Sequence, residues 1–105
     1  MAEINRLNAI LHKRIRGFIL RCLNFYPQDE TAGTVIGDFV RNCGCPCIDS
    51  EISTHLNYLE SKGYITKRAV SDRRLGNYEV VVAQITPKGV DLLEANIPED
   101  PGILV

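Results

Sequence analysis

The sequence predicts a mainly α-helical domain that carries a small β hairpin, an α+β architecture. Three observations support this prediction. Apolar residues recur at helical spacing through most of residues 2–62, and a stretch rich in β-branched and aromatic residues follows from about 64 to 85. A Thr-Pro pair at 86–87 then starts one more helix. A chain of 105 residues is long enough to build one core without disulfides, so we expect a domain over 1–95 and a proline-containing tail over 96–105.

The first helix is predicted from about Ala2 to Tyr26, and Pro27 ends it. Its apolar residues are expected to share one inward face: Leu7, Leu11, Ile15, Phe18, Cys22 and Phe25. After a polar stretch over 28–33, a shorter helix begins near Thr34 and ends at Gly44. Its inward residues are predicted to be Ile36, Phe39, Val40 and Cys43.

The third helix is predicted over about 49–62, after a tight Cys-Pro-Cys turn. Asp49 or Ser50 is expected to cap its start, and Gly63 fits the left-handed position after its last turn. Its inward stripe is Ile48, Ile52, Leu56 and Leu59, with His55 at the boundary. The opposite face is compact, polar and mostly uncharged, which suits contacts with base edges or phosphates: Ser50, Ser53, Thr54, Asn57, Tyr58 and Ser61.

Residues 64–70 and 77–85 are predicted to form the two strands of a hairpin, with Arg73 and Arg74 in the turn between them. Such a basic hairpin is well placed to reach a phosphate backbone or a minor groove. The alternative role for the two arginines is to protect an exposed strand edge against pairing with another chain. Thr86 is expected to cap the last helix, and the apolar end of the tail is expected to pack on the core or on another subunit.

The order of these elements is that of a winged helix-turn-helix domain, and two motifs make the resemblance specific. Over roughly residues 34–94 the chain resembles MarR, PadR and ArsR-like transcriptional regulators. The resemblance rests on the motif L-x-x-L-E-x-K-G-Y-I over 56–65, the basic hairpin that follows it, and the motif I-T-P-K-G-x-x-L-L over 85–93. The ending L-L-E-x-x-I-x-x-D-P-G-I over 92–103 is similar to small winged-helix proteins of Mu-like prophages.

The resemblance implies a homodimer that binds double-stranded DNA, with the third helix in the major groove and the wing, about 64–85, on the backbone or minor groove. The residues implied to contact DNA are Ser50, Ser53, Thr54, Asn57, Tyr58, Lys67, Arg68, Arg73 and Arg74. The third helix has no arginine or lysine before Lys62, so the commonest strong contact to guanine is missing. This leaves open a protein-interaction module of phage origin that does not bind DNA.

The net charge of −1 gives no general attraction to nucleic acid, so DNA binding must depend on local basic clusters. No apolar run is long enough to span a bilayer and the N-terminus lacks the layout of a secretion signal, so a cytoplasmic protein without a membrane partner is expected. No catalytic motif is present, so we expect neither an enzyme nor a cofactor.

The cysteines support a third hypothesis, a metal- or thiol-responsive regulator. Cys43, Cys45 and Cys47 fall within five residues, and closely spaced thiolates can bind a soft metal or exchange disulfides. Structural zinc sites usually need a second pair of ligands, for which Cys22, His12 and His55 are the candidates. The alternative is that the cysteines are small apolar residues in a reducing cytosol.

Overall fold

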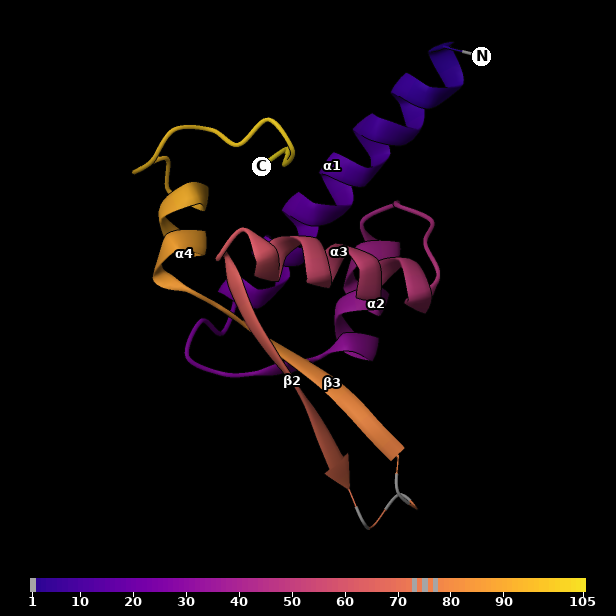
Figure 1. The fold of residues 1–105 in the computed structure, drawn as a ribbon, viewed down its shortest axis with the longest axis vertical. Coiled ribbons are helices and arrows are strands. Elements are labelled where there is room, and N and C mark those ends of the chain that lie inside the picture. The colour runs from indigo at the N-terminus through magenta and orange to yellow at the C-terminus, as the bar shows by residue number, and fades with distance from the viewer. Residues whose placement is uncertain (1, 73, 75, 77) are drawn as a thin grey trace.

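The computed structural model describes residues 2–72, 74, 76 and 78–105, and it confirms the predicted α+β architecture (Figure 1). The helices are α1 (Ala2–Asn24), α2 (Gly33–Asn42), α3 (Asp49–Ser61) and α4 (Pro87–Leu93). The strands are β1 (Thr31–Ala32), β2 (Ile65–Asp72) and β3 (Tyr78–Ile85). Among the described residues, no helix is both long enough and apolar enough to cross a membrane.

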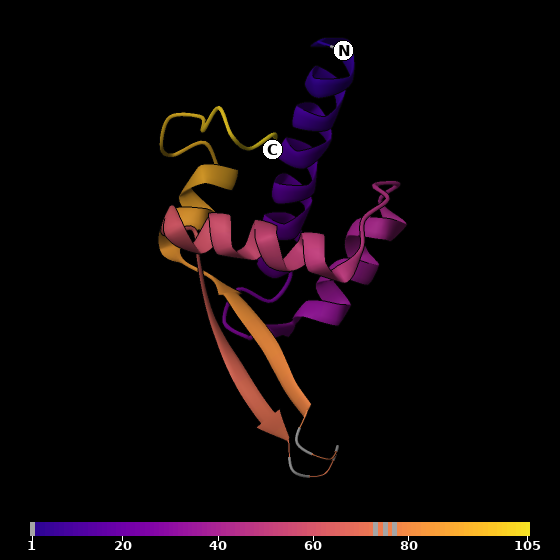
Figure 2. The ribbon, with the colours of Figure 1, turned by 45° about the vertical axis from the view of Figure 1, so that its right-hand side comes forward.

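The hairpin of β2 and β3 projects from one end of the domain, and the first turns of α1 project from the other end (Figures 1 and 2). The strands pair antiparallel in the order β1-β3-β2, with Ala69 of β2 opposite Val81 of β3. Strand β1 was not predicted from the sequence. It pairs Thr31 with Ala83, and two residues in a polar linker are too short to show any strand pattern.

The residues that cap the helices are those predicted, with one exception. Gly44 and Gly63 have φ values of +89° and +82°, the left-handed conformation that ends a helix. Thr86 Oγ1 accepts a hydrogen bond from the Gly89 N–H at 3.2 Å, as expected of a cap. The cap of α3 is different from the prediction, because Ile48 is the N-cap residue and its own N–H donates to Glu51 Oε1 at 3.1 Å.

The core lies where α1, α2 and α3 meet the base of the hairpin. Its fully buried side chains include Ile15, Ile19, Leu20, Leu23, Ile36, Val40, Ile52, Leu56, Leu59 and Ile65. The predicted inward face of α1 was partly wrong, since Leu7 is 66% exposed and Phe25 is 67% exposed. The buried face is rotated toward Ile19 and Leu23, which are fully buried in the core. The elements that contact α1 are α2, α3, β3 and α4. Ile48 is also exposed, whereas His55 is buried rather than at the boundary.

The C-terminal tail packs on α1, which is one of the two outcomes expected for it. Ile103 is buried in the core, and the Leu104 N–H donates to the Lys13 carbonyl oxygen at 3.1 Å. Gly17 allows this approach, because a Cβ atom there would overlap the Leu104 carbonyl oxygen. The tail therefore packs against α1 and is hydrogen-bonded to it.

Candidate nucleic-acid interface

The predicted face of α3 is presented to solvent. Ser50, Ser53, Thr54 and Asn57 are all exposed, while Ile52 and Leu56 on the opposite side are buried. Thr54 Oγ1 donates to the Ser50 carbonyl oxygen at 3.1 Å, which leaves its lone pairs available as acceptors. The structure thus brings four of the predicted contact residues together on one exposed, uncharged surface, which we call the α3 face.

Tyr58 differs from these four residues. It is half-buried, and the Arg16 guanidinium carbon lies 3.8 Å from the centroid of its ring. Arg16 also donates from Nη1 to the Gly102 carbonyl oxygen at 3.0 Å and from Nε to His55 Nδ1 at 3.2 Å. Tyr58 therefore belongs to a contact that joins α1, α3 and the tail.

The contact between α1, α3 and the tail continues through Asp100. Its carboxylate accepts hydrogen bonds from the Tyr64 hydroxyl at 2.7 Å and from the Gly102 N–H at 2.8 Å. Burial, followed by the hydrogen bond to Asp100, raises the pKa of Tyr64 to about 12. The turn of the tail is thus fixed against the junction of α3 and β2.

The predicted basic residues of the wing differ from one another in their surroundings. Lys67 is half-buried, and Arg68 makes two 2.6 Å hydrogen bonds from Nε and Nη2 to the Glu30 carboxylate. This hydrogen bonding from Arg68 lowers the pKa of Glu30. Arg74 is exposed, and Arg73 lies outside the described residues. Arg68 is therefore paired with Glu30 within the protein, at a side chain that remains exposed.

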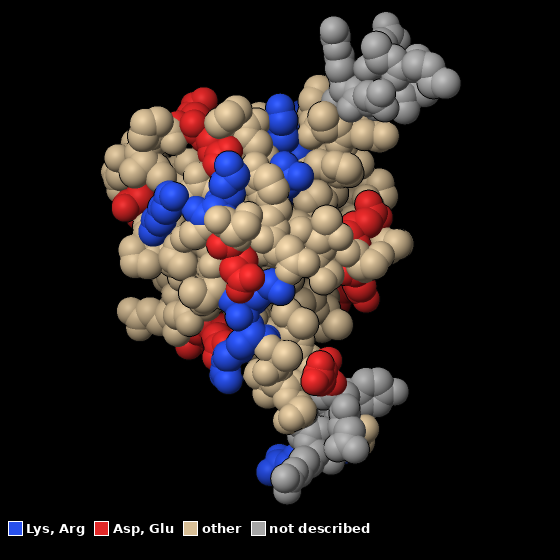
Figure 3. All heavy atoms as spheres, viewed as in Figure 1, with Lys and Arg blue, Asp and Glu red and all other residues tan. Residues whose placement is uncertain are grey.

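Charges of both signs surround the α3 face. Arg41 donates to Asp38 at 2.8 Å and to Asp49, in the first turn of α3, at 3.3 Å. In the view of Figure 3, basic side chains form a broken band toward the hairpin, with acidic side chains between them. Basic and acidic side chains are thus interspersed on this side of the molecule, in agreement with a net charge of −1.

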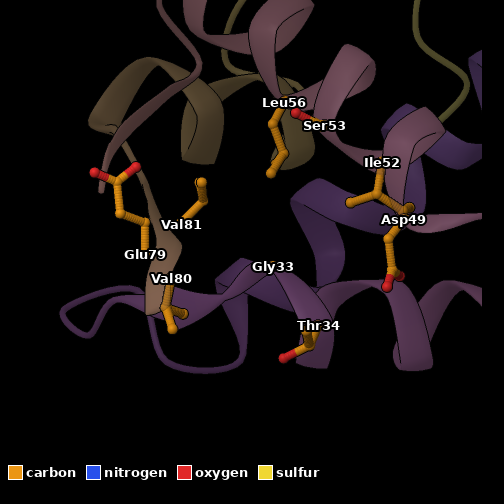
Figure 4. A pocket seen from close by; sticks show the side chains of 9 residues that line it. All are labelled: Gly33, Thr34, Asp49, Ile52, Ser53, Leu56, Glu79, Val80 and Val81. Atoms are coloured by element: carbon orange, nitrogen blue, oxygen red, sulfur yellow. The ribbon is translucent and has the colours of Figure 1, made fainter. Parts of the chain in front are cut away.

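A hollow of about 380 Å³ lies between α3, the start of α2 and β3 (Figure 4). Ile52 and Leu56 from α3 and Val81 from β3 supply its apolar surface, and their side chains point toward one another. Its other lining residues are Gly33, Thr34, Asp49, Ser53, Glu79 and Val80. No sequence pattern indicates this hollow, because it is formed by residues that lie far apart in the chain.

The cysteines lie at the helix-turn-helix turn and in the adjoining core. Cys43 is exposed, which corrects its predicted core position, while Cys22, Cys45 and Cys47 are buried. Burial is the main reason why the pKa values of the three buried thiols are raised, and this disfavours the thiolate form needed for metal binding or nucleophilic attack. Within the described ranges, no three His, Cys, Asp or Glu side chains are arranged to hold a metal ion.

Comparisons with known proteins find likeness in structure. No protein-family model and no curated protein matches the sequence. The candidate transcriptional regulator TA0346 from Thermoplasma acidophilum matches 82% of this chain and 77% of its own, with a TM-score of 0.66 and 20% identity. Bacillus subtilis PadR in complex with operator DNA matches 79% of this chain with a TM-score of 0.56 and 22% identity. The match spans 49% of PadR, so the chain corresponds to about half of that protein. With the order of elements, these likenesses show that the chain has a winged helix-turn-helix fold.

Proposed function

We propose that the protein is a DNA-binding transcriptional regulator that places α3 in the major groove and the wing on the backbone or minor groove. The observation that carries this proposal is the α3 face: four exposed hydrogen-bonding side chains, without charge, beside a projecting two-stranded hairpin. The same fold occurs in a PadR protein in complex with operator DNA, which supports DNA as the partner. The placement of α3 and the wing follows the general docking geometry of winged helix-turn-helix domains.

The chemistry of the α3 face suits the reading of bases. The Asn57 amide offers a donor and an acceptor in the geometry that pairs with an adenine edge, and serine or threonine hydroxyls bond to several bases or to phosphate. No long charged side chain must be desolvated for these contacts. We expect the arginines of the hairpin turn, Arg73 and Arg74, to add the contacts that do not depend on sequence.

Fluorescence anisotropy of the reduced protein with labelled duplexes, across a salt series, tests the proposal. Because few basic side chains are available, we expect a shallow slope of log K against log salt, about −2 to −4. Random-sequence duplexes should bind more weakly than the duplex that flanks the gene. Absence of binding at low salt would contradict DNA binding and would favour a protein-interaction module.

Asn57→Ala is expected to reduce the preference for the specific duplex over random sequence by about 1–3 kcal/mol, because a bidentate base contact is lost. Asn42→Ala is the matched control, since Asn42 is exposed at the end of α2 and away from the α3 face. Anisotropy with both duplexes measures the preference. Equal preferences for the two variants would show that the α3 face does not read the bases.

We further propose that the regulator is a homodimer joined through α1. The first turns of this helix extend beyond the rest of the domain (Figures 1 and 2), and Leu7 and Ile10 on them are 66% and 43% exposed. A short helical projection gains little stability by itself and is stabilised by packing of its apolar face. A second copy supplies the same face, and a two-fold axis would present two α3 helices to two half-sites.

Changing both Leu7 and Ile10 to Glu is expected to convert the dimer to a monomer, because two charges would be buried without partners. Light scattering after size exclusion gives the mass, and circular dichroism checks the fold. Val35→Glu is the matched control, since Val35 is an exposed apolar residue on α2. A wild-type protein that is monomeric at all concentrations would rule out this interface.

A further inference from the structure

The hollow between α3 and the wing is open to solvent and reaches the apolar core. Ile52 and Leu56 are only 2% exposed yet form part of its wall, so the hollow reaches the edge of the core. Val81 closes it from β3, and its side chain points toward Leu56 across the space (Figure 4). About 380 Å³ lies within the range of small-molecule sites, which combine an apolar surface with a few polar groups.

The charged residues that line this hollow are both acidic. Asp49 of α3 and Glu79 of β3 contribute carboxylates from two sides, and Ser53 and Thr34 contribute hydroxyls. Among the described residues that line the hollow, none is basic. Asp49 is shared with Arg41, which reaches it from α2, whereas Glu79 is exposed on the strand. A phosphate group would be repelled here, and a positive charge would be attracted.

The pleat of the hairpin places Glu79 on the same side of β3 as Val81, with its carboxylate at the outer edge of the hollow (Figure 4). Alternate residues of a strand point to the same side of the sheet, so Glu79 and Val81 share the side of Ala83 and Ile85. Ala83 and Ile85 are buried in the core. The same side of β3 therefore changes from the core to the wall of the hollow at the point where the hairpin leaves the domain.

We propose that this hollow binds a small organic cation, an aromatic or branched apolar body that carries one protonated amine. The body would contact Ile52, Leu56 and Val81, and the amine would lie toward Glu79 and the Ser53 hydroxyl. Because Ser53 also belongs to the α3 face, the bound cation would compete with DNA for it. This regulatory consequence rests on the proposed function, whereas the binding site itself does not.

Binding is measured without DNA, by titrating the isotope-labelled protein with 2-phenylethylamine and recording amide shifts by NMR. For a ligand of about nine non-hydrogen atoms, we expect a dissociation constant in the millimolar range. The shifts should be confined to the residues around the hollow, including Gly33, Ser53 and Val81. The neutral 2-phenylethanol and the anionic phenylacetate have similar bodies, and we expect them to bind at least about tenfold more weakly.

Glu79→Gln should remove most of the preference for the amine over the alcohol, while leaving binding of the alcohol unchanged. Glu60→Gln is the matched control, because Glu60 is exposed near the end of α3 and does not line the hollow. Equal binding of all three compounds, shifts located elsewhere, or an unchanged preference in Glu79→Gln would overturn the proposal. Both substitutions are at exposed positions, so the fold is expected to persist.

The regulatory consequence is tested separately by adding the amine to a protein–DNA complex. Release of DNA from the wild-type protein, but not from Glu79→Gln, is the expected result. If the protein binds the amine but never binds DNA, the site stands and the proposed function fails. If it binds DNA but not the amine, the proposed function stands and the site fails.

Discussion

Lowering the pH from 7 to 5 should reduce the free energy of unfolding by about 2 kcal/mol through His55 alone. This histidine is 3% exposed, and its Nδ1 accepts a hydrogen bond from Arg16 Nε at 3.2 Å. Burial, then the positive charge of Arg16 and the neighbouring His12, lower the pKa of His55 to about 4, against a smaller opposing effect of Glu51. The folded protein therefore holds His55 neutral at pH 5.

The sign of the effect follows from which state binds more protons. In the unfolded chain His55 has its ordinary pKa of 6.5, so it is mostly protonated at pH 5, while in the folded protein it is not. Stability is then at its full value above pH 6.5, falls as the pH is lowered, and reaches its limit near pH 4. A protonated His55 would also lose its acceptor for Arg16 and weaken the contact between α1, α3 and the tail.

Urea unfolding at pH 7, 6 and 5 measures this dependence. In His55→Gln the amide oxygen can still accept from Arg16 but does not titrate, so this variant should lose far less stability over the same range. His12→Gln keeps His55 and should retain most of the dependence. Carboxylates titrate mainly below this range, so their contribution is small. If His55→Gln and the wild-type protein show the same pH dependence, the buried neutral histidine is not the cause.

The local part of the fold could be predicted from the sequence because it depends on signals that are close together in the chain. The stripe of Ile52, Leu56 and Leu59, the left-handed Gly63 and the Thr86 cap each act within a few residues, and all three features are present. The exposed side of α3 follows directly, because it lies opposite the buried stripe. The α3 face was therefore predictable from one sequence.

The parts that could not be predicted depend on distant contacts. Arg16 is one of several arginines of α1, and nothing in its local pattern indicates that its partners are His55 and Gly102. The pairing of Arg68 with Glu30 likewise depends on how the 25–30 segment approaches the hairpin. Periodicity predicts that a helix has an apolar face. Which residues of that face are buried depends on where neighbouring elements pack against the helix, and Leu7, an apolar residue of α1, is exposed.

Gly89→Ala should destabilise the protein by about 2–3 kcal/mol, although the same change in an exposed helix would normally be stabilising. Gly89 is buried in the first turns of α4, and its N–H donates to the capping Thr86 hydroxyl. A Cβ atom there would overlap the Tyr64 carbonyl oxygen and lie 2.7 Å from Ile85 Cγ1. The Tyr64 carbonyl already accepts from the Thr86 N–H at 3.0 Å, so it cannot move without loss of that bond.

Gly33→Ala is the matched control for Gly89→Ala, since both residues lie near the start of a helix and neither has a positive φ. At Gly33 the new Cβ atom would lie 3.6 Å from the Val81 carbonyl oxygen, an ordinary contact. The loss of chain entropy in the unfolded state should make this variant equal to or up to about 1 kcal/mol more stable than wild type. Urea unfolding of both variants measures the difference. The junction of α3, β2 and α4 lies where the wing leaves the domain, so Gly89→Ala should also weaken the proposed DNA binding at temperatures where it remains folded. Equal stability of the two variants would mean that α4 can shift away from Tyr64 without cost, and that this junction does not hold the wing in place.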